Sequence, residues 1–105
     1  MPAYVVSMMS ISDAKTYREY TDRTPPIVKR YGGKFLARGG DILTVEGEEY
    51  KDRMVILEFP SRQNILDWFS DPEYQEAKAY RHASSEARIL VIDGNENTLD
   101  PDPKL

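Results

Sequence analysis

Hydrophobic and polar positions along the chain form two kinds of pattern, and their order predicts the elements of the fold. Short, nearly continuous apolar runs are typical of buried strands. Such runs predict strands at residues 3–11, 34–46, 53–59 and 88–92. Gly39 and Gly40 lie inside the second run, where paired glycines indicate a bulge or a close backbone approach. Residues 47–51 predict the turn that joins the second and third strands into a hairpin.

Steps of three and four residues between apolar positions predict a first helix over residues 14–31, with Ser10 or Ser12 as its N-cap. Gly32 suits the position just after its end. The pair Pro25-Pro26 interrupts the stripe, because proline lacks the N–H donor and clashes with the preceding turn. We therefore expect a break there and a restart capped by Thr24.

A second helical region begins at Ser61 and runs to about Glu86, with a break near its middle. At the break Asp71 can cap the following segment, and Pro72 suits its first position. The full order is β-α-β-β-α-β, which predicts a ferredoxin-like α+β domain with a four-stranded antiparallel sheet. This single domain is expected over residues 1–94, and residues 95–105 form a polar tail.

Both faces of the predicted strands are apolar. In residues 53–59, for example, Met54 and Ile56 alternate with Val55, Leu57 and Phe59. Two helical regions cover only one face of a four-stranded sheet, and large exposed apolar faces usually mark contacts. We therefore expect a homodimer in which two sheets pack against each other to close a barrel.

Composition excludes several classes of function. The 105 residues carry 14 basic and 18 acidic side chains, for a net charge of −4, so no basic face predicts nucleic-acid binding. The apolar runs are too short for a membrane span, and the start of the chain has no signal-peptide pattern. With no cysteine and one histidine, we expect no metal site. The sequence contains no nucleotide-binding motif, and we expect no cofactor. Because cysteine is absent, we expect a cytoplasmic location.

Three charged residues are candidates for chemistry. Arg81 falls on the helix face that should meet the sheet, where it could bind an anion above a pocket or form a structural salt bridge. Glu58 shares its strand face with apolar residues and is a candidate general base, or else a partner of Arg38 or Arg81. Arg38 precedes the two glycines, where a bulge could direct it towards a ligand or simply bend the strand.

Aromatic residues on the helices are candidates for the walls of a small-molecule pocket. They are Tyr17 and Tyr20 on the first helix and Trp68 and Tyr74 on either side of the second break. The alternative is that most of them are ordinary core residues.

Several segments together resemble the bacterial domain-of-unknown-function 1330 family. They are Tyr17-Arg18-Glu19-Tyr20, YGGKFLARGG at residues 31–40, Val45-Glu46-Gly47, Leu57-Glu58-Phe59-Pro60-Ser61 and WFSDPEY at residues 68–74, with Arg53 and Arg81. The resemblance covers roughly residues 3–94 and implies the dimeric α+β barrel superfamily. Relatives there include cofactor-free monooxygenases, isomerases, heme enzymes and small-molecule sensors, so the resemblance implies fold and dimer rather than one activity.

Three functional hypotheses follow. The first is a cofactor-free enzyme, monooxygenase- or isomerase-like, that acts on a small organic molecule; its motivation is the expectation that Arg81, Glu58 and Arg38 converge near a pocket lined by aromatic residues. The second is a non-catalytic module that binds or senses a small ligand. The third is a structural dimerisation domain with a filled core, which predicts no cavity above about 300 Å³.

Overall fold

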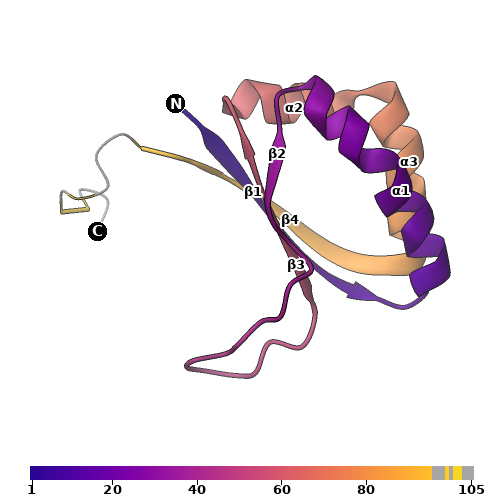
Figure 1. The fold of residues 1–105 in the computed structure, drawn as a ribbon, viewed down its shortest axis with the longest axis horizontal. Helices are drawn as coiled ribbons and strands as arrows, with labels where there is room; N and C mark the ends of the chain where they lie inside the picture. The colour runs from indigo at the N-terminus through magenta and orange to yellow at the C-terminus, as the bar shows by residue number, and fades with distance from the viewer. Residues whose placement is uncertain (96–98, 100, 103–105) are drawn as a thin grey trace.

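The computed structural model describes residues 1–95, 99, 101 and 102, and Figure 1 shows its fold. The elements are β1 (Ala3–Ile11), α1 (Ala14–Arg30), β2 (Lys34–Arg38), β3 (Arg53–Phe59), α2 (Arg62–Ser70), α3 (Pro72–Ser84) and β4 (Ser85–Asp93). The strands form one antiparallel sheet in the order β2-β3-β1-β4. The helices all lie on one side of this sheet (Figure 1). The predicted ferredoxin-like α+β fold is confirmed.

The hydrophobic core lies between the helices and the inner face of the sheet. Alternation along the strands directs Val5 of β1 and Leu57 of β3, which are paired in register, towards the helices. The core is completed by Ala3, Ile27, Val28, Val55, Phe59, Ile65, Trp68 and Tyr74. The pocket described below opens within this same layer.

The helix α1 is continuous through Pro25 and Pro26, so the predicted break is wrong. Its N-cap is Asp13, whose side chain accepts from the Thr16 N–H, rather than Ser10 or Ser12. The proline at position 25 cannot donate to the carbonyl of Thr21, one helical turn earlier. Arg38 donates to that carbonyl instead, at 3.2 Å, so the acceptor freed by the proline is satisfied from β2.

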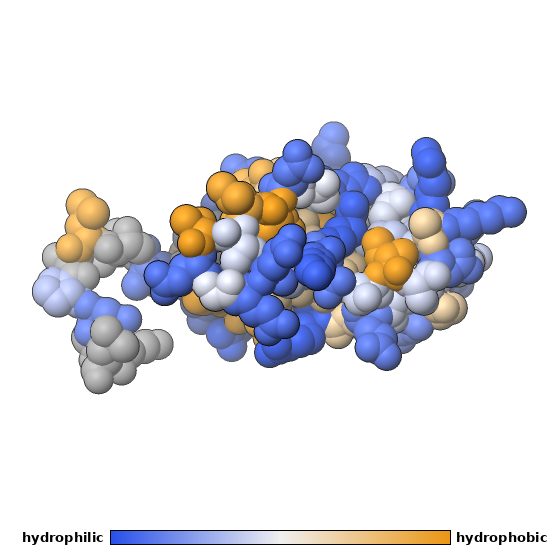
Figure 2. Space-filling view, turned by 90° about the horizontal axis from the view of Figure 1, so that it is seen from below, coloured by the Kyte–Doolittle hydropathy of each residue, from blue (hydrophilic) through white to orange (hydrophobic). Residues whose placement is uncertain are grey.

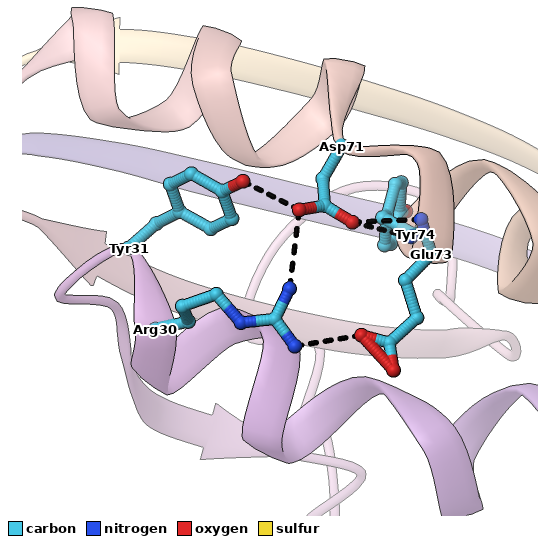
Figure 3. Close-up of polar contacts among 5 residues, drawn as sticks. All are labelled: Arg30, Tyr31, Asp71, Glu73 and Tyr74. Atoms are coloured by element: carbon cyan, nitrogen blue, oxygen red, sulfur yellow. Dashed lines mark hydrogen bonds and ion pairs between the residues drawn. The ribbon is translucent and has the colours of Figure 1, made fainter.

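The junction between α2 and α3 is fixed by Asp71, as Figure 3 shows. Its carboxylate accepts from the backbone N–H groups of Glu73, at 2.7 Å, and Tyr74, at 3.1 Å, which confirms the predicted cap. It also accepts from the Tyr31 hydroxyl, at 2.5 Å, and from Arg30, at 3.2 Å, both at the end of α1. One side chain thus ties all three helices together on the sheet.

Two predicted boundaries are wrong. The strand β2 ends at Arg38, and residues 39–52 form a long irregular loop that projects away from the helices (Figure 1). Gly39 adopts a φ of 67°, and its N–H is bonded to the Met54 carbonyl before the chain leaves the sheet. The strand β4 begins at Ser85 rather than Arg88, because Ser85 already pairs with Ile11 of β1.

The outer face of the sheet, away from the helices, carries apolar side chains that nothing in the described chain covers completely. Leu36, Leu90 and Ile92 are 52%, 45% and 60% exposed. Figure 2 shows separate hydrophobic patches among mostly hydrophilic residues on the side of the molecule seen from below. The predicted tail falls largely on residues 96–98, 100 and 103–105, which lie outside the described residues. No helix in the described part of the chain is long and apolar enough to cross a membrane.

Candidate functional site

A narrow pocket lies between α1 and the inner face of the sheet. Its lining residues are Ser7, Met9, Tyr17, Tyr20, Thr21, Thr24, Val28, Phe35, Arg38, Arg53, Val55, Leu57 and Trp68. The space free of protein atoms is about 400 Å³, part of it open to solvent, but only about 30 Å³ is wide enough for the centre of a water molecule. An organic ligand would therefore require the side chains of the wall to move apart.

Four of the candidate residues from the sequence line this pocket, namely Tyr17, Tyr20, Arg38 and Trp68. Two others do not line the pocket but lie next to Tyr20, which does. The hydroxyl of Tyr74 is 2.8 Å from that of Tyr20. The guanidinium carbon of Arg81 is 5.5 Å from the centre of the Tyr20 ring. The structure thus gathers these residues around one layer between α1, α3 and the sheet.

Arg53 lines the pocket and was not among the site candidates from the sequence. Its guanidinium carbon is 5.8 Å from the centre of the Tyr17 ring. A signal was available, because Arg53 begins β3 and alternation places it on the same face as Val55 and Leu57. Tyr17 and Tyr20, whose ring centres are 5.6 Å apart, therefore lie between two guanidinium groups.

Three buried N–H donors in this layer have no hydrogen-bond partner within the part of the chain that the structure describes. They are Nε of Arg53, Nε1 of Trp68 and Nε of Arg81. Arg81 is only 3% exposed, and no ion pair joins it or Arg53 to a carboxylate among the described residues. A buried cation without a counterion is costly, and buried donors in native proteins are normally satisfied. These donors are therefore the chemically distinctive feature of the site.

The hydroxyl groups of Tyr17 and Tyr20 remain protonated at neutral pH, because both pKa values are raised. Burial raises the pKa of Tyr17, although the charges of Arg53 and Arg81 oppose the effect. Burial raises the pKa of Tyr20 well above its usual value, and the neighbouring Tyr74 adds to the shift. Among the described residues, no carboxylate or imidazole lines the pocket. Its charged groups are therefore all cations, and none is a base suited to remove a proton at neutral pH.

Glu58 lies on the opposite face of the sheet from the pocket. In β3 it alternates with Leu57 and Phe59, which face the helices, and its carboxylate is 3.0 Å from Lys34 and accepts from Tyr4 at 3.3 Å. The hydrogen bond from Lys34 is the main cause of its lowered pKa. The structure therefore does not bring Glu58 together with the pocket arginines, either as their base or as their ion-pair partner.

The described residues hold no cluster of histidine, cysteine and acidic side chains that could bind a metal ion.

The family model described as "Domain of unknown function (DUF1330)" matches residues 2–95. The chain belongs to the DUF1330 family. Comparison of this DUF1330 chain with curated proteins finds no match.

Solved structures similar to this DUF1330 chain have the same fold. RPA0582, a protein of unknown function from Rhodopseudomonas palustris, is 24% identical with a TM-score of 0.76, over 90% of this chain and 83% of that one. SnoaB, a cofactor-independent oxygenase from Streptomyces nogalater, is 13% identical with a TM-score of 0.62, over 94% and 98%. A dimeric ferredoxin-like protein of unknown function from Bacteroides fragilis is 9% identical with a TM-score of 0.61, over 89% and 96%. At these identities the likeness shows the fold alone.

Proposed function

We propose that this chain is a homodimeric protein that binds a small organic anion in the pocket between α1 and the sheet. The observation that carries the proposal is the pair of buried donors on Arg53 and Trp68 in the pocket lining, which have no hydrogen-bond partner among the described residues. A third such donor, on Arg81, lies next to the lining residue Tyr20. Hydrogen bonds from guanidinium groups to an anionic oxygen are among the strongest that proteins make. A carboxylate or enolate bound here would neutralise Arg38 and Arg53, two lining cations that form no ion pair in the described chain.

The aromatic walls support a flat ligand. Tyr17, Tyr20 and Trp68 present ring surfaces in the pocket, and Phe35, Val28 and Leu57 add apolar area. Ligand pockets typically combine apolar walls with a few polar groups that orient the ligand. A planar aromatic or conjugated acid satisfies both the rings and the donors.

Binding is tested by calorimetry with two matched pairs of probes, benzoate against benzamide and salicylate against salicylamide. We expect the acids to bind and the neutral amides to bind at least tenfold more weakly. Replacing Arg53 with Gln should weaken benzoate binding at least tenfold, because it removes a charged donor to the anion. The control is Arg18→Gln, since the Arg18 side chain is 80% exposed on α1. Equal affinity for acids and amides, or no effect of Arg53→Gln, would contradict the proposal.

The second candidate function is cofactor-free oxygenation. The fold shared with SnoaB and with a putative antibiotic biosynthesis monooxygenase from Caulobacter crescentus, 16% identical with a TM-score of 0.65, favours it. Donors without a neighbouring base would stabilise the anion of a substrate that ionises by itself. Measuring oxygen uptake in the presence of a ligand that binds separates the two candidate functions, because a protein that only binds the ligand consumes no oxygen.

The homodimer is supported by the apolar outer face of the sheet and by the dimeric protein from Bacteroides fragilis. A second sheet packed on this face would cover the residues that the helices cannot reach. In that arrangement each copy keeps its own pocket on the far side of its sheet.

A further inference from the structure

The loop between β2 and β3 carries the two most exposed large apolar side chains of residues 1–95. In this loop, residues 39–52, Leu43 is 84% exposed, Val45 is 90% exposed and Ile42 is 39% exposed. Leu43 and Val45 are two residues apart, and both are almost fully exposed. Large apolar side chains gathered on an exposed segment usually mark a contact with another molecule.

The loop is held firmly at its base. The Gly39 N–H bonds to the Met54 carbonyl at 3.2 Å, and the Tyr50 hydroxyl bonds to the Arg53 carbonyl at 3.0 Å. Further out, the Tyr50 N–H bonds to the hydroxyl of Thr44 at 2.8 Å. The loop therefore projects from the sheet as a defined arm (Figure 1), with its apolar residues presented outwards.

We propose that this arm, residues 39–52, docks on a second copy of the chain, against the exposed end of the partner's β4. Leu90 and Ile92 of β4 are 45% and 60% exposed on the outer face that the proposed homodimer buries. The arm projects away from the helices (Figure 1). An arm that reaches the partner's sheet would extend one continuous apolar interface.

The charges of the arm and of β4 also support docking of the arm on a second copy of the chain. The arm carries Asp41, Glu46, Glu48, Glu49 and Asp52 against the single base Lys51. Register places Arg88 of β4 opposite Met8, on the outer face, and no ion pair joins Arg88 to a carboxylate among the described residues. An acidic arm beside this exposed arginine is electrostatically complementary. By two-fold symmetry each copy would give one arm and receive one.

The inference rests on the homodimer, and the tests separate the two. Sedimentation of the whole protein over a dilution series compares the double variant Leu43→Ser/Val45→Ser with wild type. We expect the dimer dissociation constant to rise at least tenfold, because the variant removes apolar contact on both arms. The control is Leu66→Ser, a residue of α2 that is 49% exposed on the helical side and should leave the constant unchanged. A wild-type dimer whose double variant dissociates like wild type would overturn the arm and leave the dimer standing.

Hydrogen exchange of wild type provides the second test. The amides of residues 42–46 should be protected at concentrations that favour the dimer and lose protection on dilution, in parallel with dissociation. Protection that does not change with concentration would mean that the arm folds onto its own chain, and it would overturn the proposal. Free exchange of these amides within the dimer would also overturn it. A wild-type protein that is monomeric throughout would remove the homodimer and the arm together.

Discussion

Asp71 shows how much one residue contributes to the position of the helices. It is only 8% exposed and accepts hydrogen bonds from α1 and from the first turn of α3 (Figure 3). Its hydrogen bond from Tyr31 is the main cause of its lowered pKa, and the first-turn N–H groups and Arg30 add to the effect. The carboxylate form is therefore favoured in the folded state.

Two substitutions of Asp71 should separate the stability that comes from its helix cap from the stability that comes from its negative charge. Asn caps a helix about as well as Asp, so Asp71→Asn should lower Tm by a few degrees, whereas Asp71→Ala, which also loses the cap, should lower it by about 5–10 °C. The control is Asp22→Asn, whose side chain is 65% exposed on α1. Thermal unfolding at neutral pH measures the difference, and equal Tm values for the two Asp71 variants would contradict the role given to the cap.

Because the pKa of Asp71 is lowered in the folded state, its contribution to stability is present at neutral pH. That contribution should be lost as the pH falls below its usual value of 3.8 towards the folded-state value. In Tyr31→Phe the main cause of the shift is absent, so the decrease in Tm between about pH 5 and 2 should be shallower than in wild type. Parallel Tm profiles for the two proteins would show that the Tyr31 hydroxyl does not carry this effect.

Individual residues were predictable where a local rule decides them. The cap at Asp71 and the turn at Gly32 follow from neighbouring sequence, and the burial of Arg81 follows from helical spacing. The place of Glu58 was not predictable in this way. Alternation tells which residues share a strand face, but only the packing of the helices decides which face holds the pocket. For Arg53, alternation gave the shared face with Val55 and Leu57, but it did not show that this face holds the pocket.

At the scale of elements, Pro25 in α1 helps to position a side chain that lines the pocket. The carbonyl that Pro25 leaves without a helical donor is the one to which Arg38 donates, at 3.2 Å. Arg38, which lines the pocket, is thereby tied to α1 rather than left free at the end of β2. The irregularity in the helix thus supplies an anchor for a side chain of the site.

Replacing Pro25 with Ala should restore the N–H donor to Thr21 and stabilise α1. We expect the free energy of unfolding to rise by about 1–3 kcal/mol, because an interior proline costs about 3 kcal/mol and its stiffening of the unfolded chain offsets part of that. The control Pro25→Gly restores the same donor with poorer helix propensity, so its gain should be about 1 kcal/mol smaller. Urea unfolding measures both, and a loss of stability in Pro25→Ala would show that the proline ring itself supports the packing.

Element types were predictable, whereas two boundaries and the helix break were not. Every strand and helix lies where the apolar periods predicted one, since period and burial have the same cause. The strand β2 ends early because Ile42, Leu43 and Val45, although apolar, pair with no strand among the described residues. Local sequence cannot show whether an apolar run will find a partner strand. It also cannot show that Arg38 would donate the hydrogen bond that Pro25 lacks.

At the scale of the whole molecule, the two faces of the sheet should respond differently to the same substitution. Val5 and Val6 are neighbours on β1, but Val5 is 0% exposed against the helices. Val6 is partly exposed on the outer face, between Ile56 and Leu90 in register. Val5→Asp buries an unpaired charge in the core and should unfold the protein.

Val6→Asp should leave the monomer folded and abolish the dimer. Its charge would lie in water on a single subunit but would be desolvated between two sheets, where an unpaired charge is strongly unfavourable. Circular dichroism checks the fold of each variant, and sedimentation at micromolar concentration gives its mass. A folded Val6→Asp protein that sediments as a dimer would place the interface elsewhere. In that case the apolar outer face would need another partner, and neither the barrel nor the exchange of arms across it would hold.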